Sequence, residues 1–130
     1  MTINQRSKGQ RGERELFALL SDQLGFVVRR NVDQVRLGGA DGLDIPGWAI
    51  EVKRAERALI APWWRQAVEQ ASHSGRRPAL VWRANRRPWR ACLRLGDVAP
   101  GRYSAAEAEA PVEMDLATAV AVIRESLDGV

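Results

Sequence analysis

Two carboxylates and an amine are closely spaced near the middle of the chain, at Asp44, Glu51 and Lys53. Pro46 and Gly47 supply turn chemistry between two short runs typical of strands, which predicts a β-hairpin. The two-residue repeat of a strand places Glu51 and Lys53 on one face, and a tight hairpin brings Asp44 close to them. Two carboxylates with a backbone carbonyl between them suit a hard divalent ion such as Mg²⁺, and the amine could orient or deprotonate an attacking water.

The same residues have a simpler interpretation, because a Glu-x-Lys sequence is common in strands. Asp44 would then belong to a turn, and Glu51 and Lys53 would form an ordinary pair on a solvated strand face. The usage of basic residues favours the metal-site interpretation, since the chain has 18 arginines and only two lysines, Lys8 and Lys53. Arginine stays charged at any working pH, whereas lysine can lose its proton when desolvated, so a site that needs a tunable amine requires lysine.

A helix from Gln10 to Leu24 is predicted before the hairpin, after polar residues 1–7 that we expect to lack regular structure. Gly25 suits its C-terminal cap. Its apolar stripe consists of Phe17, Leu20 and Leu24, with Leu16 beside it. Glu13 lies on this stripe and therefore points toward the core, where an acid needs a partner such as a bound metal ion. A first-turn acid favoured by the helix dipole is the alternative, and Glu15, on another side of the helix, is assigned no special role.

A second helix is predicted from Pro62 to Ser74, because proline suits a first helical turn and Gly75 suits the end of a helix. One of its faces combines aromatic, alanine and glutamine side chains: Trp63, Gln66, Ala67, Gln70 and Ala71. Close packing of the alanines on a sheet would bring Gln66 and Gln70 near the charged face of the hairpin. Plain surface glutamines are the alternative.

These residues resemble a known superfamily. Asp44 followed by Glu51-Val52-Lys53 resembles the signature of the PD-(D/E)XK nucleases. The lead-in Lys8 to Glu15 resembles the opening of the archaeal-type Holliday junction resolvases and their phage-encoded relatives, and the resemblance extends to Leu95. Two features depart from the signature, because no proline precedes either aspartate and the gap from Asp44 to Glu51 is short, which leaves Asp41 as an alternate ligand.

The resemblance implies a Mg²⁺-dependent DNA endonuclease that hydrolyses phosphodiester bonds, with Mn²⁺ tolerated in place of Mg²⁺. The implied metal ligands, direct or through water, are Glu13, Asp44 and Glu51, with the carbonyl of Val52 as a further ligand. Lys53 would orient the nucleophilic water. Gln66 or Gln70 would take the place of the glutamine that lies beside the metal in the resembled resolvases.

The resemblance further implies a homodimer that presents two sites to a four-way DNA junction, in the cytoplasm of a bacterium or a phage-infected host cell. Nothing in spacing or composition shows junction specificity, so nicked, flap or linear duplex DNA remain alternative substrates. A basic nucleic-acid-binding module without catalysis is a third interpretation. The intact set of Asp44, Glu51 and Lys53 argues against it, since a decayed nuclease would be expected to lose one member.

The order of predicted elements is helix, strand, hairpin, helix, strand, strand, which indicates an α/β domain with a central mixed β-sheet flanked by helices. The resemblance implies the restriction-endonuclease-like version of this class. The strands outside the hairpin are expected at residues 26–30, 79–83 and 89–95. We expect residues 1–103 to form the nuclease domain and residues 104–130 to form an acidic linker with a C-terminal amphipathic helix, Leu116 to Leu127, capped by Asp115. That helix would pack on the same domain or form a dimer contact.

Charge is divided unevenly along the chain. Residues 1–103 carry 19 basic and 10 acidic side chains, whereas residues 104–130 carry one basic and six acidic side chains. A basic body is typical of a protein that binds a polyanion, although a merely solubilising surface is the alternative. The candidate DNA contacts are Lys8, Arg11, Arg29, Arg30, Arg36, Arg54, Arg83, Arg86, Arg87 and Arg90.

Two classes of protein are disfavoured. No apolar run approaches the length of a membrane span, and the polar N-terminus has no signal-peptide core. The single cysteine, Cys92, cannot form an internal disulfide, and its place in an apolar strand predicts a packing role in a reducing compartment.

Overall fold

The computed structural model describes residues 3–25 and 42–128 of the 130-residue chain, with side chains described for residues 14–25 and 45–127. Five described strands form one sheet in chain order: β1 (Gly42–Ile45), β2 (Trp48–Ala55), β3 (Arg77–Ala84), β4 (Arg90–Arg94) and β5 (Pro111–Asp115). Strands β2 and β3 are parallel, and the other neighbouring strands are antiparallel. The sheet is therefore mixed, as predicted.

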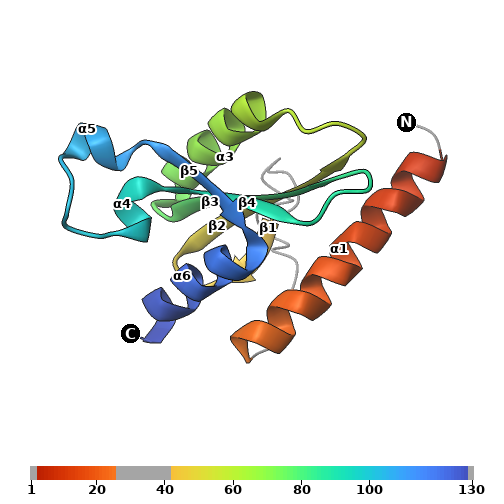
Figure 1. Cartoon of the computed structure of the whole chain (residues 1–130), viewed down its shortest axis with the longest axis horizontal. Coiled ribbons are helices and arrows are strands. Elements are labelled where there is room, and N and C mark those ends of the chain that lie inside the picture. Colours follow the sequence, from red (N-terminus) through yellow and green to blue (C-terminus); the bar gives the residue numbers. More distant parts are fainter. Residues whose placement is uncertain (1–2, 26–41, 129–130) are drawn as a thin grey trace.

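Helices cover both faces of this sheet (Figure 1). Helix α3 (Ile60–Ser74) connects the parallel strands and packs on one face, while α1 (Ile3–Leu24) and α6 (Leu116–Asp128) pack on the other. Two short helices, α4 (Leu95–Val98) and α5 (Ala105–Ala108), lie at the end of the molecule far from α1 (Figure 1). The arrangement confirms the predicted α/β class with a restriction-endonuclease-like sheet.

The predicted hairpin is present as β1 and β2. Ile45 pairs with Trp48 across the Pro46-Gly47 turn, and Gly47 has a φ of 80°. Proline followed by a residue at positive φ is the combination of a type II turn, in which glycine avoids the clash that a side chain would meet. The turn thereby fixes the register of the strand that carries Glu51 and Lys53.

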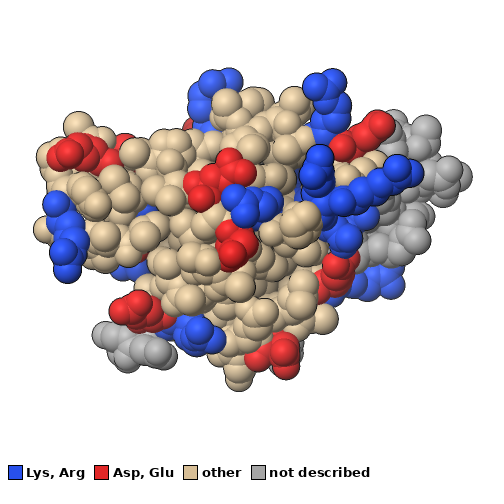
Figure 2. Space-filling model, in the orientation of Figure 1, with Lys and Arg blue, Asp and Glu red and all other residues tan. Residues whose placement is uncertain are grey.

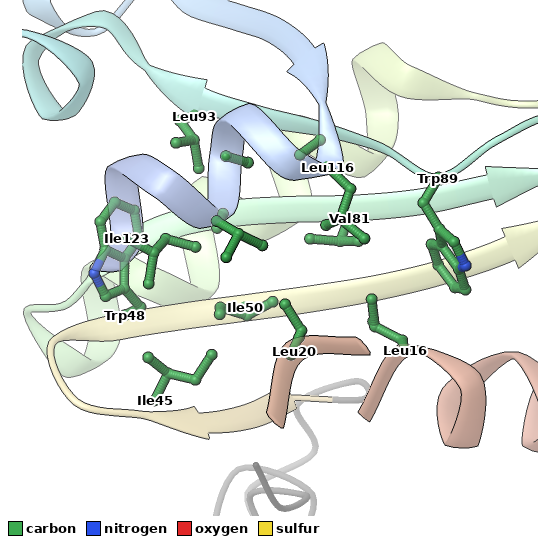
Figure 3. Close-up of a cluster of buried hydrophobic side chains, with 14 of the residues drawn as sticks. Leu16, Leu20, Ile45, Trp48, Ile50, Val81, Trp89, Leu93, Leu116 and Ile123 are labelled. Carbon is green, nitrogen blue, oxygen red and sulfur yellow. The ribbon is translucent and has the colours of Figure 1, made fainter. Parts of the chain in front are cut away.

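The larger part of the core lies between the sheet and the α1/α6 layer. Figure 3 shows Leu16 and Leu20 of α1 and Leu116 and Ile123 of α6 directed toward side chains of the sheet. A smaller cluster on the opposite face joins α3 to the strands: Trp64, Ala67, Leu80, Trp82 and Cys92. Because β3 contributes to both clusters, its central run is buried on both sides, as its continuous apolar sequence predicts.

Element boundaries differ from the predicted ones at several points. Helix α1 begins at Ile3, so the expectation that residues 1–7 lack regular structure is wrong for residues 3–7. That segment has no apolar stripe to mark it, yet it also has no proline to stop a helix. Helix α3 begins at Ile60, which places Pro62 in its first turn. Gly75 ends α3 in the left-handed conformation, as predicted. The predicted strand at residues 26–30 lies outside the described residues.

The C-terminal part of the chain is more structured than a linker and a helix. Residues 105–108 form α5, which begins with a capping box between Ser104 and Glu107. Strand β5, which was not predicted, pairs with β4 along the edge of the sheet. Asp115 then caps α6 as predicted, because its carboxylate accepts a hydrogen bond from the Thr118 N–H at 2.7 Å.

Candidate active site

Glu51 and Lys53 lie on the face of β2 that α3 covers. Trp48, Ile50 and Val52 belong to the core cluster on the opposite face, so the alternation of the strand places the two charged residues with α3. Only 1% of Glu51 is exposed, and its Oε1 lies 3.6 Å from the Lys53 Nζ. An ordinary pair on a solvated strand face, the simpler interpretation of this sequence, is therefore wrong for Glu51.

The burial of Glu51 follows from its neighbours in the sheet. Its partner in the parallel strand is Leu80, which is fully buried, and α3 packs over both strands. An ionised carboxylate placed there loses several kcal/mol of hydration, which nearby cations and hydrogen bonds must offset. Within the described part of the chain, Glu51 is the only buried charged residue. Buried acids of this kind are concentrated at functional sites.

Strand β2 continues past the end of its pairing with β1. The last residue pair between them is Gly42 with Glu51, whereas the pairing with β3 continues to Ala55. Among the described residues, Val52 to Ala55 thus have a neighbouring strand on one side only. In the described part of the chain, the β1–β2 pairing therefore ends at Glu51, while the pairing of β2 with β3 extends past it.

The predicted glutamine face of α3 is rotated slightly in the structure. The side chains that α3 buries are Trp64, Ala67 and Ala71, and the two glutamines, Gln66 and Gln70, are half-buried beside this apolar ridge. Trp64, instead of the predicted Trp63, is the buried tryptophan of α3 in the cluster against the sheet, and Trp63 packs beside it half-buried. Both glutamines remain on the helix that covers the Glu51 face, and His73 is exposed at its end.

The remaining acids of the predicted site are described only in part. The backbone of Asp44 pairs with Ala49, two residues before Glu51. The side chains of Asp44 and Glu13, and the whole of Asp41, lie outside the described residues. Among the described side chains, no three acids, histidines or cysteines are grouped so that they could hold a metal ion. Glu51 is the only acid of the predicted metal set among those side chains, and Val52, whose carbonyl completes the set, follows it in β2.

Cationic side chains gather at the end of the molecule where the parallel strands finish. Figure 2 shows Lys and Arg concentrated on the side that carries the β3–β4 turn in Figure 1. Arg86 and Arg87 are exposed in this turn, Arg54 and Arg83 are half-buried below it, and Arg90 is paired with Glu113 at 3.6 Å. Trp82 and Trp89, on either side of the turn, are buried. The other candidate DNA contacts, Lys8, Arg11, Arg29, Arg30 and Arg36, lie outside the described side chains.

Glu15 has a structural role that the sequence did not reveal. Its two carboxylate oxygens accept hydrogen bonds from the Arg83 Nη1 at 2.7 and 2.8 Å, and Oε1 also accepts one from the Trp89 Nε1 at 3.3 Å. Arg54 Nη1 lies 4.0 Å from the same carboxylate. These partners are distant in sequence, so no local pattern on α1 could identify them.

Cys92 is buried against α3, and burial, with a smaller effect from the charge of Glu113, raises the pKa of its thiol to about 11. A protonated thiol is a poor nucleophile and a poor metal ligand, so the packing role predicted for Cys92 agrees with its surroundings. No helix in the described part of the chain is both long and apolar enough to cross a bilayer.

A buried acid and a lysine lie two residues apart on a β-strand, which follows a hairpin turn and is covered by the next helix, as in the PD-(D/E)XK signature that the sequence resembles. A family model described as phage putative PDDEXK endonuclease matches residues 4–113. The chain therefore belongs to this family of PD-(D/E)XK endonucleases. No curated protein and no solved structure matches the chain.

Proposed function

We propose that the protein is a Mg²⁺-dependent DNA endonuclease that acts as a homodimer and cleaves four-way DNA junctions. The observation that carries the proposal is the buried Glu51 carboxylate with the Lys53 ammonium 3.6 Å away. Membership of the endonuclease family supports phosphodiester hydrolysis as the reaction. The step from endonuclease to junction resolvase rests on the resemblance of residues 8–15 to the resolvases.

The donor atoms available fit a hard divalent cation. Glu51 supplies a buried carboxylate, and the backbone of Asp44 pairs with Ala49, two residues before Glu51 in β2. In the proposed site, Asp44 and Glu51 hold the metal with the Val52 carbonyl and Glu13, directly or through water, and Asp41 is the alternate for Asp44. An oxygen-only ligand set favours Mg²⁺ or Mn²⁺ over softer metals. The bound metal supplies Lewis-acid stabilisation of charge on the phosphate.

The protein side chains have separate tasks in this proposal. Lys53 holds the attacking water beside the phosphate through its ammonium group, and 23% of its side chain is exposed, which leaves it open to a bound ligand. Glu51 fixes the position of Lys53 through their ion pair. Gln66 or Gln70, half-buried on α3 above this face, orients the water or the phosphate through its amide.

The substrate is tested with a labelled four-way junction and a linear duplex of the same sequence, each incubated with the protein in Mg²⁺ and in chelator. The proposal predicts paired symmetric cuts in the junction, in Mg²⁺ only, and little cutting of the duplex. Equal Mg²⁺-dependent cutting of both would retain the nuclease and reject junction selectivity. Binding without cutting in any metal would favour the non-catalytic module.

The dimer is tested by sedimentation or light scattering on the free protein and on its complex with the junction. A mass of two chains per junction is expected, because paired cuts require two active sites. One chain per junction would reject the homodimer.

A further inference from the structure

The turn between β3 and β4 combines exposed charge with an unusual backbone. The Arg87 N–H donates to the Ala84 carbonyl at 3.1 Å and closes a four-residue turn. Arg86, at its third position, has a φ of 62° and is the only non-glycine residue with positive φ in the described part of the chain. Glycine or asparagine is the usual occupant of such a position. Non-glycine residues in this strained region are concentrated at functional sites.

The charges of the turn are available to a ligand. Arg86 and Arg87 are exposed, and no ion pair to either is found among the described residues. The turn lies at the end of the sheet where β2 also finishes, the end at which Figure 2 shows Lys and Arg gathered. Guanidinium groups form charge-assisted, often bidentate hydrogen bonds with phosphate oxygens, so two exposed arginines on a short turn suit contacts with a nucleic-acid backbone.

Hydrogen bonds to residues on either side of this turn hold it in place. Arg83 precedes the turn, and its Nε donates to the Arg87 carbonyl at 3.0 Å while its Nη1 donates to both oxygens of Glu15. Trp89 follows the turn and donates to the same carboxylate. Glu15 on α1 therefore holds both ends of the segment that carries Arg86 and Arg87.

We propose that the β3–β4 turn, Ala84 to Trp89, binds the DNA phosphate backbone through Arg86 and Arg87, and that Glu15 is a positioning residue for it. This inference rests on the proposed DNA endonuclease function. An acid placed among arginines would by charge alone weaken DNA binding. The geometry instead indicates that Glu15 strengthens DNA binding, because it orders the arginines that contact the phosphates.

The phosphate contacts are tested with the double variant Arg86→Gln/Arg87→Gln, compared with Arg102→Gln. Arg102 is an exposed arginine in the loop between α4 and α5, at the opposite end of the molecule. Junction and duplex affinities are measured by fluorescence anisotropy in chelator over a series of salt concentrations. The double variant is expected to bind about tenfold or more weakly, with a slope of log affinity against log salt reduced by about 2, and Arg102→Gln to bind like the wild type. Equal affinity and slope for the double variant would overturn the assignment.

Folding and binding are separated by Arg86→Gly. Glycine adopts a φ of 62° without strain, so this variant is expected to melt at or above the wild-type temperature and yet bind DNA more weakly. A variant that is as stable as the wild type and binds DNA equally well would show that the Arg86 side chain makes no phosphate contact.

The positioning role is tested with Glu15→Gln. We expect weaker DNA binding although a negative charge is lost, whereas tighter binding would overturn the role. In the background of Arg86→Gln/Arg87→Gln, Glu15→Gln should cause no further loss of affinity, because it acts through the turn. An additive loss would instead indicate a general effect on the fold. If the wild-type protein cleaves DNA and the turn variants bind DNA normally, this inference alone is rejected. If the wild-type protein neither binds nor cleaves DNA, the proposed function is rejected as well.

Discussion

The carboxylate of Glu51 and the ammonium of Lys53 lie 3.6 Å apart on the α3 face of β2, with 2% of the Glu51 side chain and 23% of the Lys53 side chain exposed. The acid is thus enclosed by protein while the base reaches the surface. This difference suits a division of tasks in which Glu51 fixes charge inside the site and Lys53 meets the substrate or its water.

Replacement of Lys53 by arginine tests the need for an amine. Arginine keeps the charge but is bulkier, planar and unable to give up a proton, so we expect DNA affinity to persist and the cleavage rate to fall by about a hundredfold or more. Single-turnover cleavage and anisotropy on the same junction measure the two effects. Lys8→Arg, the same change at the chain's other lysine, serves as the control and should cleave normally. Near-normal cleavage by Lys53→Arg would show that a fixed positive charge suffices.

The two aspartates before the hairpin turn are distinguished by separate alanine variants. The backbone of Asp44 pairs with Ala49 in the strand that carries Glu51, so Asp44→Ala is expected to abolish metal-dependent cleavage. Asp41→Ala is expected to retain it. Cleavage assays in Mg²⁺ compare the two, and the reverse result would transfer the ligand role to Asp41.

Metal binding should be visible in thermal unfolding without any DNA. At ten times its dissociation constant, a ligand that binds only the folded state adds about 1.4 kcal/mol of stability. For a domain of this size we expect Mg²⁺ to raise the melting temperature by about 3–6 °C. The rise should disappear in Glu51→Gln and persist in Glu113→Gln, since Glu113 is an exposed acid on β5. An equal rise in all three proteins would indicate nonspecific ion binding.

The thiol of Cys92 is expected to respond to pH as a buried group. Its pKa is raised to about 11 from an ordinary value of 9.0, so the protonated thiol favours the folded state. This contribution to stability is fully present below pH 9 and is lost as the pH rises through 11. At pH 8 a disulfide reagent such as DTNB should react slowly with the native protein and rapidly in urea. Rapid reaction of the native protein would contradict the burial of Cys92.

Local signals in the sequence were sufficient for the central elements of the fold. The Pro46-Gly47 turn, the alternation of β2 and the Gly75 cap each involve residues within one turn or strand, and each is present. The start of α1 and the strand β5 were missed, because the first lacks an apolar stripe and the second is an edge strand with mostly exposed side chains. Strand β5 depends on its pairing with β4, which no local pattern records.

The candidate site, too, was predicted in part from local signals and depends in part on the tertiary fold. Spacing alone placed Glu51 and Lys53 on one face, but the burial of Glu51 depends on β3 and α3, which come later in the chain. The hydrogen bonds of Glu15 join residues 68 and 74 positions apart, so its pattern on α1 gave no sign of them. Long-range pairing of charges could be found only from the fold.

The most direct test of the account is the rate of Mg²⁺-dependent junction cleavage by Glu51→Gln, measured beside Glu113→Gln. Glutamine preserves the shape of the side chain and removes the buried charge, so correct folding is confirmed first by circular dichroism. We expect that Glu51→Gln binds the junction and does not cut it, while Glu113→Gln cuts it at the wild-type rate. Cleavage by a folded Glu51→Gln at the wild-type rate would contradict the assignment of the active site to β2.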